Sequence, residues 1–273
     1  MPIDHYENFP VASILLPKHL RRPVELIYAF ARSADDFADE GQLPPEERLA
    51  KLEDYDAELV RIAAGEDPKS TLFRDLQLVI AVHALPVQLF RDLVDAFKQD
   101  VTQTRYADFG QLLDYCRRSA NPVGRLMLCL FRQTDPRNLA ECDAICTALQ
   151  LANHWQDVAV DWKKNGFGRV YLPQDDLASF GLGDLDIERQ VCSDAWSRMM
   201  DFQCERTRAL MHSGMPLAKR LGGRIGAELR FVVAGGLAIL DKIQRVRGDV
   251  FRQRPVLTKR DWIAIAPRAL LGL

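Results

Sequence analysis

Residues 23–40 read PVELIYAFARSADDFADE, an apolar segment that opens with a proline and ends in acidic residues. On a helix, where successive residues are about 100° apart, Val24 and Tyr28 lie on one stripe. Asp35 and Asp39 continue that stripe, at about 20° and 60° from Val24. An ordinary amphipathic helix places its acidic residues on the wet face. The segment therefore predicts a helix with two carboxylates on its inner face or, alternatively, a frayed and solvated helix end.

Residues that typically begin or end helices recur along the rest of the chain. Prolines, glycines and capping residues delimit further predicted helices at 45–64, after Ser70, after Pro86, and at 108–119, 122–132, 138–163, 187–213 and 215–247. Residues 169–172 are the only short strand candidate, and residues 165–186 form the longest stretch without a helical pattern. We therefore expect one all-α domain over residues 1–273, with about eight to ten helices.

Composition narrows the class of protein. The chain has 273 residues, of which 48% are apolar and 27% are charged, with a formal net charge of −2. This composition is typical of a globular protein, and a general nucleic-acid binder would have a basic excess. The longest clean apolar run, residues 231–240, is shorter than the roughly 20 residues that span a bilayer. No basic-then-apolar leader is visible, and the six cysteines form no CxxC motif, so we expect a cytoplasmic protein with reduced thiols.

A second acidic stretch, residues 149–161, reads LQLANHWQDVAVD. On a helix, Gln150, Asn153, Asp157 and Asp161 share a sector roughly 80° wide beside an apolar stripe. The stretch therefore repeats the spacing of two aspartates four residues apart, here with an amide one turn earlier.

Asp100 extends an apolar stripe in the same way, because it falls near Leu89 and Leu93 on a helical projection. A single aspartate of this kind has two further interpretations, a helix-end residue or the partner of a neighbouring arginine. We therefore expect it to support the picture of inward-facing acids without deciding it.

The residue types in these motifs indicate a hard cation. Carboxylate and amide oxygens without a histidine or cysteine cluster are ligands that Mg²⁺ prefers. Two facing aspartate pairs could hold several Mg²⁺ ions around a diphosphate and stabilise the charge that develops as it leaves. Arg32, near the first pair, and Arg169, after the second, could add phosphate contacts.

The motifs together resemble the squalene and phytoene synthase family of trans-isoprenoid head-to-head synthases. The matching stretches are IYAFAR leading into DDFAD at 27–39, DYC leading into NPVG at 114–124, the stretch at 149–161, and GRVYLP at 168–173. Their order and spacing span nearly the whole chain. The resemblance implies an isoprenoid synthase fold, with helices around a central apolar cavity.

The resemblance also implies roles for individual residues. Mg²⁺-related roles fall to five oxygen-bearing residues of the acidic motifs: Asp35, Asp39, Asn153, Asp157 and Asp161. Tyr115 would act in catalysis beside the reacting carbons. Contacts with the substrate and its diphosphate fall to residues of the same motifs: Arg32, Gln150, Arg169, Tyr171 and Asn121.

Within the family, the chain is most similar to the hydroxysqualene synthases of bacterial hopanoid biosynthesis, at residues 5–13, 119–125 and 152–158. Condensing members usually carry an arginine where this chain has Gln156, and some carry a tyrosine near Gly236. Both departures remove groups suited to a second diphosphate. The resemblance therefore implies presqualene diphosphate as substrate, several Mg²⁺ ions as cofactors, and no need for NADPH.

Two other functions remain open from the sequence. The first is condensation of two farnesyl diphosphates to presqualene diphosphate, squalene or a phytoene-type product. The second is a non-catalytic relative that acts as a binding or assembly module, although such a protein would not need both aspartate pairs.

The sequence also bears on contacts with other enzymes and with membranes. Transient contacts with other enzymes of the squalene pathway would suit a pathway enzyme. The apolar stretch 262–273 follows several basic residues and predicts either peripheral membrane contact or a terminal helix packed on the domain.

Overall fold

The computed structural model describes residues 16–39, 43–164 and 168–271, and these residues form helices and connecting segments without a strand. The all-α prediction is thus confirmed. The described helices are α1 (Lys18–Asp39), α2 (Pro45–Ala64), α3 (Thr71–His83), α4 (Val87–Thr102), α5 (Phe109–Ser119), α6 (Asn121–Leu130), α7 (Pro136–Gln156), α8 (Val158–Asp161), α9 (Gln174–Ser179), α10 (Asp184–Glu188), α11 (Asp194–Gly214), α12 (Pro216–Leu221), α13 (Gly223–Arg245) and α14 (Lys259–Leu271).

The described residues form more helices than the eight to ten expected, and the additional helices are short. α9 lies within residues 165–186, which the sequence pattern left without helices, and α10 begins in that stretch and ends at Glu188. The short strand candidate at residues 169–172 forms no strand. The amide of Val170 donates to the carbonyl of Thr104 at 3.0 Å, a hydrogen bond between two connecting segments. The predicted helix at 138–163 is divided at Asp157, whose φ of −104° and ψ of 9° leave the helical region.

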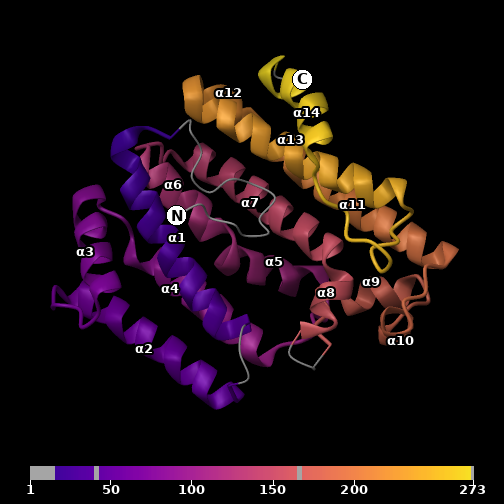
Figure 1. Ribbon diagram of the computed structural model, residues 1–273, viewed down its shortest axis with the longest axis horizontal. Coiled ribbons are helices and arrows are strands. Elements are labelled where there is room, and N and C mark those ends of the chain that lie inside the picture. The colour runs from indigo at the N-terminus through magenta and orange to yellow at the C-terminus, as the bar shows by residue number, and fades with distance from the viewer. Residues whose placement is uncertain (1–15, 40–42, 165–167, 272–273) are drawn as a thin grey trace.

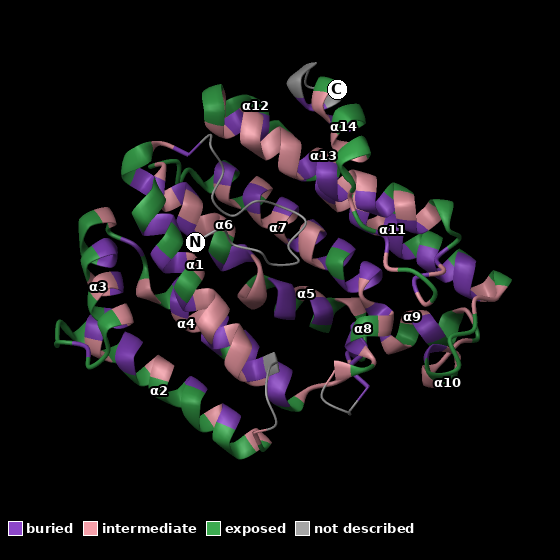
Figure 2. Cartoon of the chain, in the orientation of Figure 1, coloured by how far each residue is buried: buried purple, intermediate pink, exposed green. Residues whose placement is uncertain are grey.

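α7 lies at the centre of the arrangement. It packs against α5, α6, α11, α12 and α13, while α4 packs against α1, α2, α5 and α6. The long helices lie side by side, with the N-terminal helices at one flank of α7 and the C-terminal helices at the other (Figure 1). Buried positions form stripes along the faces by which these helices meet (Figure 2). The acidic end of α7 is therefore positioned by helices from both halves of the chain.

Apolar side chains gather in three clusters. The first joins α1 to α4 and α6, and it includes Phe30 and Phe90, neither of which is exposed. The second surrounds the end of α7 and reaches α5, α11 and α13, with Trp155 and Trp196 fully buried. The third lies between the start of α7 and α12 and α13. The second cluster packs directly beneath the acidic end of α7.

The six cysteines are all free thiols, in line with the sequence.

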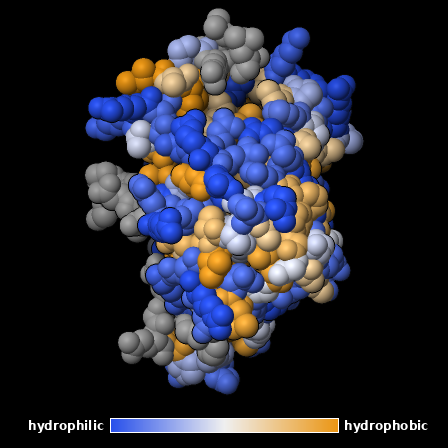
Figure 3. All heavy atoms as spheres, turned by 90° about the vertical axis from the view of Figure 1, so that its right-hand side faces the viewer, coloured by the Kyte–Doolittle hydropathy of each residue, from blue (hydrophilic) through white to orange (hydrophobic). Residues whose placement is uncertain are grey.

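At the C-terminal end of the described chain, α14 packs against α13 and buries Ile265 and Ala269. This is the packed terminal helix that was one of the two interpretations of the stretch 262–273. Among the described residues, no helix combines the length and apolar character that crossing a membrane requires. The end of the molecule near α9 and α10 shows hydrophobic patches between hydrophilic ones (Figure 3).

Two glycines mark close helix contacts of different kinds. A Cβ at Gly214, the last residue of α11, would lie 2.5 Å from the backbone oxygen of Glu141 and from Cγ1 of Ile145. A Cβ at Gly236 in α13 would meet the ends of the Leu149 and Met211 side chains at 2.8 Å. Side-chain ends can move aside, whereas the carbonyl of a central helix cannot.

We therefore expect Gly214→Ala to lower the free energy of unfolding by about 1–3 kcal/mol. Gly236→Ala is the matched control, since side-chain shifts there are offset by a helix-propensity gain of about 1 kcal/mol. Urea unfolding of both variants measures the difference. Equal losses in the two variants would contradict the close backbone contact at α11 and α7.

Candidate active site

The first acidic motif lies in the last turns of α1. The helix runs unbroken through Asp39, so the frayed-end interpretation is wrong for these residues. Arg32 contacts both neighbouring carboxylates, with Nη1 3.6 Å from Asp35 Oδ2 and Nη2 2.7 Å from Asp36 Oδ1. All three side chains are about one third exposed. The side chain of Asp39 lies outside the described part of the structure, so the spacing of the first aspartate pair stays a prediction.

The second acidic motif spans the junction of α7 and α8. Asp157 leaves helical geometry, yet the ladder of hydrogen bonds continues through it. Its amide donates to the Asn153 carbonyl at 2.9 Å, and the Asp161 amide donates to the Asp157 carbonyl at 2.8 Å. These bonds keep the three residues one turn apart, as the sequence predicts. Asn153 is exposed, Asp157 is half-buried and Asp161 is buried.

Both aspartates of this second motif meet cations of the protein. Arg254, from the segment between α13 and α14, forms a two-pronged ion pair with Asp157, in which Nη2 lies 3.1 Å from Oδ2. Lys164 Nζ lies 3.7 Å from Asp161 Oδ1. Gln156, which precedes Asp157 in the chain, is buried, and its side-chain amide donates to the carbonyl of Pro255. The segment around residues 254–255 is thereby tied to the acidic turn.

Asp100, at the end of α4, is the centre of a buried polar cluster. Its two carboxylate oxygens accept hydrogen bonds from the hydroxyls of Tyr115 at 2.8 Å and Tyr171 at 3.1 Å. Arg169 Nη2 donates to the backbone carbonyl of Asp100 at 2.6 Å, and Arg169 Nη1 donates to Tyr171 Oη at 3.2 Å. Arg169 Nη1 also lies 4.0 Å from Asp100 Oδ1, so Asp100 is the partner of an arginine, and it stands in the last turn of α4 as the helix-end interpretation has it.

Aromatic rings close this cluster on one side. The His154 ring stacks on Tyr171, with centroids 3.7 Å apart and planes 15° apart, and Tyr106 lies within 5.6 Å of both Tyr115 and Tyr171. Burial, and after it the charge of Asp100, raises the pKa of Tyr115 and Tyr171 well above the usual tyrosine range. Burial lowers the pKa of His154 to about 3. The cluster therefore presents neutral phenols and a neutral imidazole at pH 7.

The structure brings three of the sequence-predicted residues together and places Asn121 elsewhere. Tyr115, Arg169 and Tyr171 converge on Asp100, and the amide of Arg169 donates to the carbonyl of Asp161 at 3.2 Å. Asn121, in contrast, accepts a hydrogen bond from Thr147 at 2.9 Å and joins α6 to α7.

One further sequence-predicted candidate, Gln150, lies on α7. Gln150 is half-buried on α7, in the same sector as Asn153. Sequence reasoning did not single out Arg254 or Lys164, because a lone basic residue far from its partner gives no periodic signal.

The oxygen donors of the second motif suit Mg²⁺ in chemistry. Asn153, Asp157 and Asp161 offer an amide and two carboxylates on successive turns, with no sulfur or imidazole donor among them. The described residues do not, however, bring three acidic, histidine or cysteine side chains within range of one ion. Protein cations occupy the carboxylates instead. These residues would hold the metal after exchanging Arg254 and Lys164 for it.

Residues 4–261 match the family model for squalene/phytoene synthases. The chain belongs to the squalene/phytoene synthase family. A hydroxysqualene synthase of Rhodopseudomonas palustris is 36% identical over 240 residues, which cover 87% of this chain and 80% of that protein. A 15-cis-phytoene synthase of Synechococcus elongatus is 30% identical, over 97% of this chain and 88% of that protein. As a member of this family, the protein is an enzyme, and the predicted resemblance is confirmed.

Solved structures of squalene/phytoene synthase relatives share the fold. The squalene synthase HpnC from Alicyclobacillus acidocaldarius superposes with a TM-score of 0.80 at 39% sequence identity, covering 89% of this chain and 90% of that one. A dehydrosqualene synthase superposes with a TM-score of 0.82 at 20% identity, over 94% of this chain and 88% of that one. The second likeness concerns the fold alone. The isoprenoid synthase architecture expected from the sequence is therefore confirmed.

The ion pair at Asp157 gives a testable expectation. Arg254→Gln should lower the free energy of unfolding in the absence of divalent ions by about 1–3 kcal/mol, because a partly buried carboxylate loses its charged partner. The same variant should bind Mg²⁺ several-fold more tightly, because Mg²⁺ no longer has to displace a guanidinium. Thermal unfolding at graded Mg²⁺ concentrations measures both effects.

Arg91→Gln is the control for this comparison. Arg91 of α4 pairs with Asp56 of α2, with Nε 2.7 Å from Oδ1, away from either acidic motif. It should lower stability without changing the response to Mg²⁺. If Arg254→Gln responds to Mg²⁺ as the unaltered protein does, the exchange at Asp157 does not take place.

Proposed function

We propose that this enzyme converts presqualene diphosphate into hydroxysqualene and diphosphate, as a step in squalene and hopanoid formation. The observation that carries the proposal is Gln156. It stands where, by the family resemblance, condensing members usually carry an arginine, and its amide is turned into the protein, toward Pro255. The similarity to hydroxysqualene synthases over most of the chain supports the same assignment. A prenyl diphosphate substrate agrees with the family as a whole.

The reaction begins with cleavage of the carbon–oxygen bond, and the diphosphate leaves with the electron pair. The cyclopropylcarbinyl cation then rearranges, water adds its oxygen to the opened cation, and the water proton is released. Bound Mg²⁺ would stabilise the negative charge of the departing diphosphate. No hydride donor is needed, so the proposal includes no NADPH.

Residues of the chain take the remaining tasks in this proposal. Arg32, beside the first acidic motif, would bind phosphate oxygens, since it is one third exposed on α1. Asn153, Asp157 and Asp161, with Asp35 and Asp39, would hold the ions. The neighbouring rings of Tyr106, Tyr115 and Tyr171 would face positive charge on the substrate, because aromatic faces attract cations. Gln150 and Asn121 would line the substrate site.

Condensation of two farnesyl diphosphates is the second candidate. The 30% identity with phytoene synthases favours it. Two features of this chain argue against a second diphosphate. Gln156 is bound to Pro255, and Gly236, near the position where some condensing members carry a tyrosine, faces Leu149 and Met211. Membrane contact and contacts with other pathway enzymes stay predictions.

The expected outcome is a product assay with each diphosphate supplied separately. Purified protein with Mg²⁺ and without NADPH should convert presqualene diphosphate to hydroxysqualene and leave farnesyl diphosphate unchanged. Asp157→Asn should reduce the rate at least 100-fold, because one oxygen donor loses its charge. Gas chromatography with mass detection identifies the products.

Asp56→Asn serves as the control, since it removes a carboxylate from an ion pair between α2 and α4, apart from the acidic motifs. It should keep the full rate. Turnover of farnesyl diphosphate alone would establish condensation instead. Full activity of Asp157→Asn would overturn the metal-binding role of the second motif.

A further inference from the structure

Asp100 stands out among the acidic residues because its carboxylate is buried and yet fully engaged by side chains. Only 6% of its surface is exposed. The Tyr115 hydroxyl reaches one oxygen at 2.8 Å, the Tyr171 hydroxyl reaches the other at 3.1 Å, and Arg169 Nη1 lies 4.0 Å from the latter oxygen. A buried carboxylate is costly to desolvate, and an apolar residue often stabilises a fold as well as a buried charge does. Fold stability alone therefore does not explain why a carboxylate is buried at position 100.

The backbone around Asp100 does not depend on that carboxylate. The amide of Val170 donates to the carbonyl of Thr104 at 3.0 Å, and the amide of Gln174 donates to the carbonyl of Tyr106 at 2.9 Å. These bonds hold the segment after α8 against the connection from α4 to α5. What the carboxylate adds is the orientation of the side chains that point at it.

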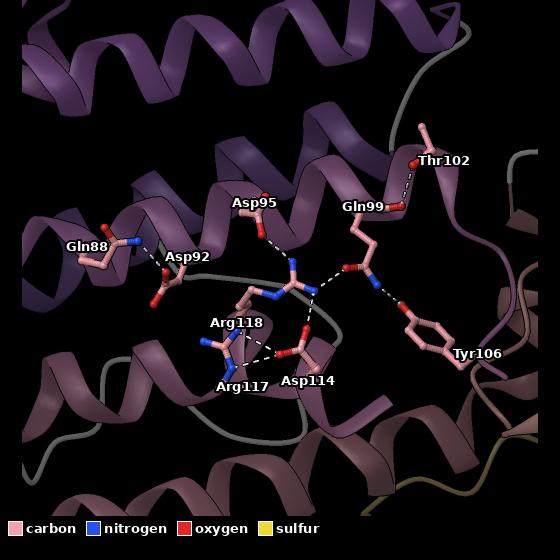
Figure 4. A network of polar contacts seen from close by, with 9 residues as sticks. All are labelled: Gln88, Asp92, Asp95, Gln99, Thr102, Tyr106, Asp114, Arg117 and Arg118. Atoms are coloured by element: carbon pink, nitrogen blue, oxygen red, sulfur yellow. Dashed lines mark hydrogen bonds and ion pairs between the residues drawn. The ribbon is translucent and has the colours of Figure 1, made fainter. Parts of the chain in front are cut away.

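The junction of α4 and α5 has its own support as well. Arg118 of α5 donates to Asp95 and Gln99 of α4 and to Asp114 of its own helix, and Gln99 donates to the Tyr106 hydroxyl at 3.2 Å (Figure 4). These hydrogen bonds and ion pairs join α4 to α5 through side chains other than that of Asp100. Loss of the Asp100 charge therefore leaves the two helices linked.

We propose that Asp100 is a positioning residue of the reaction, whose carboxylate holds the hydroxyls of Tyr115 and Tyr171 and thereby sets the rings that face the substrate. The inference rests on the proposed function for the identity of the substrate. Asp100 acts through the tyrosines and does not touch the reacting atoms. The backbone carbonyl of Asp100 accepts from Arg169 Nη2 at 2.6 Å, which is a shorter contact than the 4.0 Å between Arg169 Nη1 and the carboxylate.

Because the shorter Arg169 contact is made to the backbone, Asp100→Asn changes mainly the contacts with the two tyrosines. Asparagine retains the backbone carbonyl that Arg169 binds, but it offers a single side-chain oxygen, and its NH₂ group cannot accept from a phenol. We expect kcat to fall at least tenfold, with KM for presqualene diphosphate changed less than threefold. Asp56→Asn is the matched control, because Asp56 also accepts two bonds at α4, from Arg91 on its opposite face. It should leave both constants unchanged.

Fluorine NMR of protein labelled with 3-fluorotyrosine gives a readout that does not require turnover. The chain has six tyrosines, whose resonances can be assigned by single Tyr→Phe variants. Asp100→Asn should shift the resonances of Tyr115 and Tyr171 and leave that of Tyr55, in α2, in place. Asp56→Asn should leave the Tyr115 and Tyr171 resonances unchanged. A purely structural role would lower the melting temperature and leave the kcat of the folded variant unchanged.

A double-mutant comparison decides whether Asp100 acts through Tyr115. The combined Asp100→Asn and Tyr115→Phe variant should have a kcat no lower than the worse single variant. Multiplied effects, or a kcat of Asp100→Asn within twofold of the unaltered enzyme, would overturn the proposal.

Tyr171→Phe covers the case in which Asp100→Asn does not fold. It should shift the Tyr115 resonance through the shared carboxylate and lower kcat several-fold, and no change in either would also overturn the proposal. If the unaltered enzyme leaves presqualene diphosphate intact and consumes farnesyl diphosphate, the proposed function fails. The same variants are then compared on farnesyl diphosphate, and the NMR result stands by itself.

Discussion

A carboxylate that leaves water needs a cation or several hydrogen-bond donors in its place, and this constraint shapes the interior of the protein around α7. Arg32 meets Asp35 and Asp36, Arg254 meets Asp157, Lys164 meets Asp161, and Arg169 with two tyrosines meets Asp100. Arg32 and Lys164 lie within about one turn of their acids, whereas Arg254 and Arg169 come from distant positions along the chain. The two long-range contacts therefore add to apolar packing in holding the connecting segments at the site.

The sequence was informative where structure is decided locally. Helical periodicity predicted that Asp35 prolongs an inner stripe and that Asn153, Asp157 and Asp161 share a sector, and hydrogen bonds through the α7–α8 junction preserve that sector. The same reasoning missed α9 and α10, because five or six residues form little more than one turn and show no period. The strand candidate at residues 169–172 forms no strand, because a short run does not by itself supply a partner strand.

Long-range pairing was beyond the reach of the sequence. Arg254 lies 97 residues from Asp157, and Arg169 lies 69 residues from Asp100. A pattern along one helix shows that a carboxylate faces inward and needs a partner, but many basic residues could serve. The absence of an arginine at position 156 was visible, whereas the inward turn of Gln156 toward Pro255 required the fold. The sequence thus indicated the acids and the two bases within its motifs, Arg32 and Arg169, whereas Arg254 and Lys164 required the fold.

The central position of α7 has a consequence for how genes of this kind can diverge. Five other helices pack around it, while its last turns bear the polar sector. One residue inserted midway along α7 would rotate everything downstream by about 100° and lengthen the helix by about 1.5 Å. The apolar start would stay in place, and the acids would turn into the core. Insertions and deletions should accumulate in the outer connections, and the number of residues in α7 should be as restricted as their identity.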